Sequence, residues 1–174
     1  MNGWQVSSQM SKTWLALGGN IGNVLHHFQA VRKSLENHPS CHILTSSLLY
    51  QTPPMGPEGQ ADYLNAALYL ETSLSPIDLL DVLQDLEQQH GRVRHEHWGA
   101  RTLDLDIIAY DDISMDSERL ILPHQHMHCR QFVLRPMCDI SPNWLHPNQR
   151  KTARELLKAI LSTGDLPLSN GQKW

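Results

Sequence analysis

The chain has 174 residues, a formal net charge of −4 and 40% hydrophobic residues. This length suits one domain that buries a core without staples, and the acidic balance argues against a general nucleic-acid surface. The sequence contains no apolar run of membrane-spanning length and no signal-peptide core at its start. Its three cysteines show no CxxC spacing, which favours reduced thiols in a cytoplasmic protein.

Residues 1–11 are polar and aperiodic, so we expect a disordered N-terminal extension before a single domain over 12–174. That domain opens with an apolar strand from Trp14 to Leu17, followed by the turn Gly18-Gly19-Asn20. Helical spacing of apolar residues then predicts a helix over 22–37. A glycine turn between strand and helix can cradle phosphate. This one matches neither the Rossmann nor the P-loop pattern, which favours a tight turn.

Strands and helices alternate through the rest of the chain. We expect strands over 43–51 and 63–71, then a helix that begins at Ser75-Pro76 and ends at Gly91. After a central strand, the patterns predict a short strand at 120–122, a turn or short helix at 123–128, and helices at 132–138 and 152–161. The order β-α-β-β-α-β predicts an α+β fold with a ferredoxin-like core, whose antiparallel sheet is covered by helices in an αβα arrangement.

The chemistry concentrates in residues 91–110, GRVRHEHWGARTLDLDIIAY, whose second half alternates as a strand with one buried face does. The two faces would carry Thr102, Asp104, Asp106 and Ile108, and Leu103, Leu105, Ile107 and Ala109. Asp104 and Asp106 then form a carboxylate pair, which suits two Mg²⁺ ions that clamp phosphoryl oxygens. For the pair alone, two solvated acids on an exposed strand face are the alternative interpretation.

An arginine-rich loop precedes the carboxylate pair. Arg92, Arg94 and Arg101 have the planar side chains that bind polyphosphate bidentately, and the indole of Trp98 offers a flat surface for a ring. Six of the nine arginines fall between Arg92 and Arg135. Loop and carboxylates together indicate a Mg-nucleotide site. Because no P-loop is present, arginines and Mg²⁺ would hold the phosphates.

Thr52-Pro53-Pro54, with Tyr63 and Asn65, can wall a pocket for a flat heterocycle, because backbone groups and an amide match its donor and acceptor edge. The alternative is a turn followed by an ordinary exposed strand. Glu87 lies one turn before the expected helix end and Gln84 one turn earlier. Both fit a helix surface as well as a site.

A histidine cluster invites a zinc interpretation. His124, His126 and His128, followed by Cys129, would gather on one side only if the segment were extended. A turn or short helix after Pro123 would disperse them, and contact of one histidine with a phosphate is the other interpretation.

Taken together, these segments resemble the 6-hydroxymethyl-7,8-dihydropterin pyrophosphokinase family of folate biosynthesis. The matching stretches run from Thr13 to about Leu161 and read LALGGNIGN, YQTPPMGPEGQADYLNAALYLET, LEQQHGRVR, WGARTLDLDII, ERLILPH and RQFVLRP. The combination WGxRTLDLDI with a downstream LPH is the specific part. The resemblance implies a ferredoxin-like fold and transfer of pyrophosphate from ATP to the hydroxymethyl group of the pterin, with release of AMP.

The resemblance also implies roles for individual residues. The catalytic set would be Arg92, Arg101, Asp104 and Asp106, with the two aspartates holding two Mg²⁺ ions. The pterin would contact Thr52, Pro53, Pro54, Met55, Tyr63, Asn65, Trp98 and Phe132. ATP would lie along Gln84, Glu87, Arg94, Trp98, Arg101, Ile107, Arg119, His124 and Arg130. The expected partners are ATP and the pterin, without nucleic acid or membrane, and the expected state is a cytoplasmic monomer.

The sequence departs from the family pattern at a few positions. Gly19 replaces a common serine, Ala100 a common proline, and Gln125 stands where some relatives have an aromatic residue. The loop over 94–98 is one residue shorter. These changes bear on loop dynamics and nucleotide affinity rather than on the reaction. A binding module that kept only the fold would typically lack a metal carboxylate or a loop arginine, and this chain has both sets.

Overall fold

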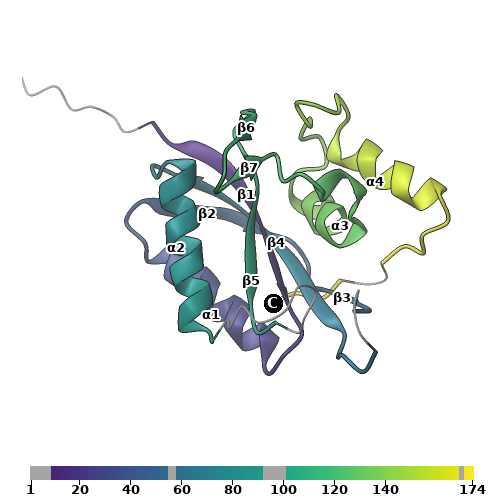
Figure 1. Cartoon of the computed structure of the whole chain (residues 1–174), viewed down its shortest axis with the longest axis horizontal. Coiled ribbons are helices and arrows are strands. Elements are labelled where there is room, and N and C mark those ends of the chain that lie inside the picture. The colour runs from purple at the N-terminus through teal and green to yellow at the C-terminus, as the bar shows by residue number, and fades with distance from the viewer. Residues whose placement is uncertain (1–8, 55–57, 92–100, 169–170) are drawn as a thin grey trace, which may run out of the picture.

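The computed structural model describes residues 9–54, 58–91, 101–168 and 171–174. Within these residues the main sheet has five strands, which are β1 (Ser11–Gly19), β2 (Cys41–Ser46), β3 (Tyr50–Thr52), β4 (Tyr63–Thr72) and β5 (Asp104–Tyr110). Four of them follow the order β2-β4-β1-β5, every neighbouring pair is antiparallel, and β3 extends the pairing of β4 (Figure 1). This order confirms the predicted ferredoxin-like core.

Helices are α1 (Val24–Glu36), α2 (Pro76–Gln89), α3 (Gln131–Ile140) and α4 (Ala153–Ser162), with one 3-10 turn, η1 (Met127–Cys129). Side-chain caps define three of the starts. The side chain of Ser75 accepts the backbone N–H of Asp78 before Pro76, and Thr152 forms a reciprocal capping box with Glu155. Asn23 caps α1 in the same way. No helix in the described ranges is long and apolar enough to cross a membrane.

The sheet separates two hydrophobic layers, which confirms the αβα arrangement. On one face α1 and α2 pack against alternate strand residues such as Leu15, Leu68 and Leu105. On the other face α3 and α4 pack against residues such as Trp14 and Ile108. Figure 1 shows the two helix pairs on opposite sides of the strands. Both faces are apolar over most of their length, so polar side chains on either face stand out.

Two sequence expectations were wrong in detail. The strand expected over 43–51 is divided into β2 and β3, because both the N–H and the side-chain oxygen of Ser47 bond the backbone of Ala67 and interrupt regular pairing. On β5, Trp14 pairs with Ala109 but Leu15 pairs with Ile107, so Ile108 is an extra residue in a β-bulge. Ala109 therefore packs with the α3 layer instead of sharing the face of Ile107.

The remaining segments extend the core. β6 (Met115–Asp116) pairs with β7 (Ile121–Leu122) as a separate ribbon, in agreement with the short strand expected at 120–122. The turn or short helix expected at 123–128 corresponds to η1. The last described residues return to the sheet, where Gln172 forms an isolated bridge with Leu49.

Candidate active site

One row of cross-strand neighbours crosses the sheet on the face that also carries α3. Tyr50 of β3 pairs with Asn65 of β4, Asn65 pairs with Gly18 of β1, and Gly18 pairs with Asp104 of β5. Neighbouring strands lie about 4.8 Å apart, so the backbones of Asn65 and Asp104 stand about 10 Å apart with Gly18 between them. Gly18 adds no side chain, and a Cβ there would lie 3.5 Å from Asn65 Oδ1. Gly18 therefore leaves open surface between the Asn65 amide and the Asp104 carboxylate, and we call this surface the floor of the site.

The predicted carboxylate pair lies on this same face. Asp106 pairs with Ala16, which packs against the α3 layer, and Asp104 lies two residues away on the same side. The Arg101 guanidinium donates to Asp104 Oδ2 at 2.7 Å, and both side chains keep partial exposure, 31% and 24%. Hard carboxylate oxygens are the ligands that Mg²⁺ prefers, and Asp106 borders a cavity. The donor set therefore fits the implied Mg²⁺, with substrate phosphates supplying further oxygens.

The glycine turn holds Arg101 in place. The carbonyl of Arg101 accepts the backbone N–H groups of Asn20 and Ile21, and its N–H donates to Asn20 Oδ1 at 2.9 Å. A Cβ on Gly19 would come within 2.6 Å of the Thr102 carbonyl, so this close approach requires glycine. Asn20 is buried, and its amide also bonds Gln60 and Ala61. Sequence reasoning missed Asn20, although an asparagine after two glycines at a strand end was a usable signal.

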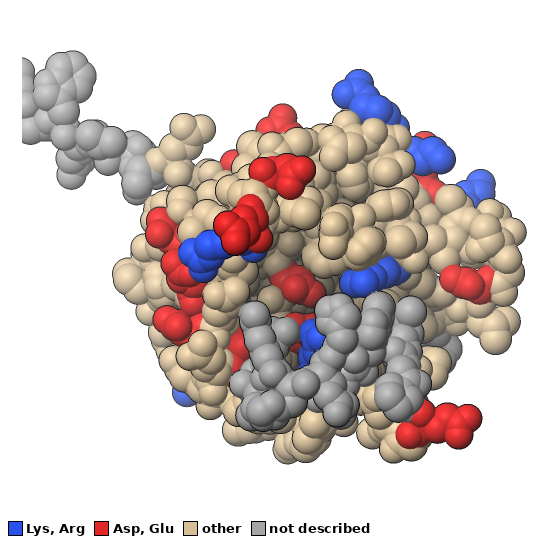
Figure 2. All heavy atoms as spheres, in the orientation of Figure 1, with Lys and Arg blue, Asp and Glu red and all other residues tan. Residues whose placement is uncertain are grey.

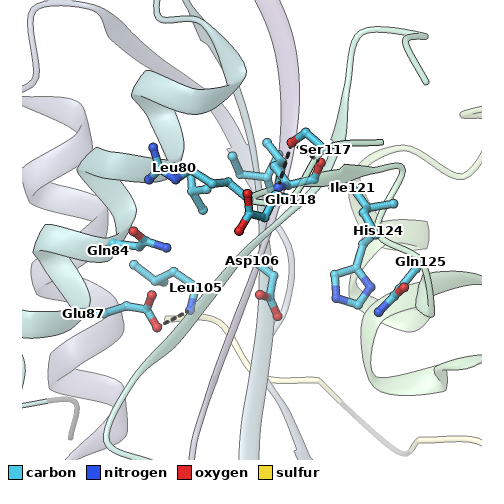
Figure 3. A pocket seen from close by; sticks show the side chains of 13 residues that line it. Leu80, Gln84, Glu87, Leu105, Asp106, Ser117, Glu118, Ile121, His124 and Gln125 are labelled. Carbon is cyan, nitrogen blue, oxygen red and sulfur yellow. Dashed lines mark hydrogen bonds between the residues drawn. The ribbon is translucent and has the colours of Figure 1, made fainter. Parts of the chain in front are cut away.

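A cavity of about 330 Å³ opens beside the carboxylates, between α2 and residues 117–125. It brings together six of the residues predicted for ATP or metal, which are Gln84, Glu87, Asp106, Ile107, Arg119 and His124. In Figure 3 the Asp106 carboxylate and the His124 ring both point into this space, opposite Gln84 and Glu87. On the side of the molecule shown in Figure 2, acidic side chains lie in a central hollow and basic side chains lie at its rim.

Glu87 is part of the protein interior and not a helix-surface charge. Only 3% of it is exposed, and its Oε2 accepts the backbone N–H of Leu105 at 3.4 Å. Leu105 belongs to β5, which is an edge strand among the described residues, so this carboxylate accepts an N–H that no described strand pairs with. Glu87 thereby joins α2 to the strand that carries both aspartates. Gln84 lies one turn earlier and lines the same cavity.

The residues predicted to wall a heterocycle pocket lie at the other end of the row, on β3 and β4. The Asn65 amide donates to Thr52 Oγ1 at 2.7 Å, and both residues are buried, which orients the amide. Tyr63 pairs with Thr52 across the strands. Burial raises the pKa of Tyr63, the Arg101 cation opposes the rise and the Asp104 anion adds to it, so all three groups lie within electrostatic reach. Phe132 comes from α3, with the Arg130 guanidinium 5.7 Å from its ring centre.

Four of the predicted site residues lie outside the described residues. They are Met55, Arg92, Arg94 and Trp98. Pro53 and Pro54 are described and directly follow β3.

His124 has a defined tautomer in the cavity. Its backbone N–H donates to the Ile108 carbonyl at 2.8 Å, and its Nδ1 accepts the backbone N–H of His126 at 3.2 Å. A neutral ring that accepts at Nδ1 carries its proton on Nε2. Burial, and then the nearby Arg130 cation, lower the pKa of His124 to about 4. At neutral pH, His124 is therefore a neutral donor through Nε2–H.

This lowered pKa predicts a specific loss of stability in acid. The unfolded chain binds a proton at His124 below about pH 6.5, whereas the folded chain binds it only near pH 4, so the free energy of unfolding falls as pH drops through this window. The contribution of His124 is at most about 3 kcal/mol. Asn in its place keeps an acceptor for the His126 N–H. Urea unfolding from pH 7 to 4.5 should show a shallower loss for His124→Asn than for the wild type, and parallel curves would refute the assignment.

The zinc interpretation finds no support in this part of the chain. No group of three or more His, Cys, Asp or Glu side chains within the described residues is arranged to hold a metal ion. The cluster is dispersed instead. His126 lies beside His124, whereas His128 faces His146 with 6.0 Å between ring centres, and the Cys129 thiol donates to the His126 carbonyl.

Comparison with known proteins agrees with this geometry. The model of the 7,8-dihydro-6-hydroxymethylpterin-pyrophosphokinase (HPPK) family matches residues 14–142. Two proteins named 2-amino-4-hydroxy-6-hydroxymethyldihydropteridine pyrophosphokinase are similar over most of their length. That of Haemophilus influenzae is 41% identical over 81% of this chain and 88% of its own. That of Pseudomonas aeruginosa is 40% identical over 86% and 92%.

Solved structures show the same fold. The wild-type HPPK-DHPS of Plasmodium falciparum with pteroate superposes with a TM-score of 0.72 at 14% sequence identity, over 88% of this chain. The chain spans 45% of that longer protein, so the likeness concerns the fold of the matched part alone. The family match covers most of the chain, and the two bacterial relatives are matched almost end to end. This chain therefore belongs to the 7,8-dihydro-6-hydroxymethylpterin-pyrophosphokinase family.

Proposed function

We propose that the protein transfers pyrophosphate from ATP to the hydroxymethyl group of 6-hydroxymethyl-7,8-dihydropterin in folate biosynthesis. The products are AMP and the dihydropterin diphosphate. The observation that carries this proposal is the row across the sheet, in which a buried amide and a carboxylate lie on either side of Gly18. Such a floor lets one ligand lie against the amide and place its hydroxyl beside phosphates at the carboxylates.

The pterin binds at the Asn65 end of the row. The Asn65 amide and the backbone that follows β3, over residues 52–55, read the donor and acceptor edge of the ring. Tyr63 and Phe132 contact its two faces, and Trp98 completes this side. The bond from Asn65 to Thr52 supports the proposal, because an amide oriented before binding loses little freedom when the ligand arrives.

ATP binds on the β5 side, along the cavity between α2 and residues 117–125. Asp104 and Asp106 hold two Mg²⁺ ions, which neutralise phosphate charge when bound. Arg101 and the Nε2–H of His124 donate hydrogen bonds to phosphate oxygens, and Arg92 and Arg94 add charge from the preceding loop. Gln84, Glu87, Ile107, Arg119 and Arg130 line the rest of the nucleotide path.

Release of AMP means that the pterin hydroxyl attacks the β-phosphorus of ATP. The hydroxymethyl oxygen forms a bond to the β-phosphorus of ATP, the bond between that phosphorus and the α,β-bridging oxygen breaks, and the hydroxyl proton is released. The chain supplies positioning and charge rather than a covalent intermediate. Stabilisation by Arg101 matters most when charge moves to the bridging oxygen. The proposed setting is the cytoplasm, which the free thiols of Cys41, Cys129 and Cys138 favour, and the proposed state is a monomer.

The test is the nucleotide product formed from ATP and Mg²⁺, with and without the pterin. We expect AMP only when the pterin is present, and we expect EDTA to abolish it because the carboxylates then lack their metal. A protein that binds ATP or pterin but forms no AMP would instead be a binding module with this fold, and the proposed function would be rejected.

A further inference from the structure

The two walls of the proposed pterin pocket belong to different layers of the protein. β3 and β4 carry Thr52, Tyr63 and Asn65, whereas Phe132 belongs to α3. A flat ring touches both faces of the pocket only when the faces stand about 7 Å apart, which is twice an optimal contact of roughly 3.5 Å. A contact that fixes α3 relative to β3 therefore sets how well the ring fits. The following inference rests on the proposed function for that reason.

Asp139 and Tyr50 join the two layers directly. The hydroxyl of Tyr50 donates to Asp139 Oδ2 at 2.7 Å, and the backbone N–H of Leu48 donates to the same oxygen at 3.2 Å. Arg135 lies 3.2 Å from the other carboxylate oxygen, and its guanidinium lies 5.2 Å from the centre of the Tyr50 ring. Both oxygens of Asp139 therefore have partners. One oxygen accepts from Tyr50 of β3 and from Leu48 just before it, and the other pairs with Arg135 of α3.

The contact between Tyr50 and Asp139 is buried, and the Tyr50 hydroxyl keeps its proton. Tyr50 is 1% exposed, and the Asp139 side chain is 15% exposed. Burial, followed by the hydrogen bond and the negative charge of Asp139, raises the pKa of Tyr50 to about 12. The hydroxyl therefore remains a donor throughout the pH range of any enzyme assay.

Both partners are aligned with pocket residues. Tyr50 is the cross-strand partner of Asn65 and lies two residues before Thr52 on the same face of β3. Asp139 follows Phe132 by seven residues, or about two helical turns, so both lie on one side of α3. We propose that the Tyr50–Asp139 hydrogen bond is a positioning contact, which sets the spacing between the Phe132 wall and the Asn65 wall and thereby the affinity for the pterin.

The test uses Tyr50→Phe, which removes only the hydroxyl. Calorimetry with the pterin and a non-hydrolysable ATP analogue should show pterin binding about three- to tenfold weaker, the effect of losing one buried hydrogen bond. The affinity for the ATP analogue alone should not change. Tyr110→Phe is the matched control, because its buried hydroxyl donates to the Leu74 carbonyl on the opposite layer. Both variants should lower the melting temperature, but only Tyr50→Phe should weaken pterin binding.

Variants of Asp139 test the same contact from the other side. Asp139→Asn keeps an oxygen acceptor for Tyr50 and should bind pterin nearly as the wild type does. Asp139→Ala should weaken pterin binding at least as much as Tyr50→Phe, because it also removes the contacts of Asp139 with Leu48 and Arg135. The double variant should be no worse than Asp139→Ala alone, because residues of one unit are not additive. Unchanged pterin affinity in Tyr50→Phe and Asp139→Ala would overturn the inference while leaving the proposed function standing. Absence of pterin binding by the wild type would overturn both.

Discussion

Asp106→Asn should lower kcat by about 10³-fold or more while the protein stays folded, because the change removes a metal-binding charge at almost constant shape. Asp106 lies on the α3-facing side of β5, borders the cavity and points into it (Figure 3). An asparagine cannot balance the charge of Mg²⁺ as a carboxylate does. Steady-state kinetics at saturating ATP and pterin measures the loss, and circular dichroism with a melting curve measures the fold.

Asp116→Asn is the matched control for this prediction. Asp116 is an exposed carboxylate on β6 and lies outside the cavity lining. Its replacement changes net charge by the same amount and should leave kcat within about twofold, as surface substitutions usually do. Asp104→Asn should resemble Asp106→Asn. Near-normal turnover by a folded Asp106→Asn protein would contradict the assignment of Asp106 as a metal ligand, although it would leave the proposed reaction standing.

Arg101→Ala should lower kcat by about 10²-fold or more and change the Michaelis constants for ATP and pterin by far less. The guanidinium donates to Asp104, at the β5 end of the row, where charge would move during transfer. An interaction that strengthens only in the transition state appears in kcat rather than in binding. The backbone of Arg101 keeps its three bonds to the glycine turn in the variant, so the turn should remain folded.

Two further variants separate charge from geometry. Arg101→Lys keeps the positive charge but loses the planar fork, so it should recover only part of kcat. Arg119→Ala removes a cavity arginine that is paired with Asp81 on α2, and it should act mainly on the Michaelis constant for ATP. If Arg101→Ala weakened nucleotide binding and left kcat unchanged, Arg101 would be a binding residue and not a catalytic one.

Local patterns predicted the parts of the fold that depend on local physics. Alternation placed Asp104 and Asp106 on one face of a strand, and the Ser75-Pro76 pair located the start of α2, because strand period and helix caps are set by neighbouring residues. The bulge at Ile108 and the break at Ser47 escaped prediction because both arise from pairing with distant strands.

Parts of the site were beyond sequence reasoning for the same reason. The burial of Glu87 depends on β5 being an edge strand that leaves the Leu105 N–H for a carboxylate. The clamp of Asn20 on Arg101 joins residues 81 positions apart. The contact of Tyr50 with Asp139 joins residues 89 apart and gives no sign in either local segment. Only the arrangement of strands and helices brings these groups together.

The central claim is that β- and γ-phosphates move together to the pterin, and ³¹P NMR of the reaction products tests it most directly. ATP, Mg²⁺ and 6-hydroxymethyl-7,8-dihydropterin should give two coupled phosphorus signals of a pterin diphosphate ester and one signal of AMP. A pterin monophosphate together with ADP would contradict the account, since it would mean attack at the γ-phosphorus and transfer of a single phosphoryl group.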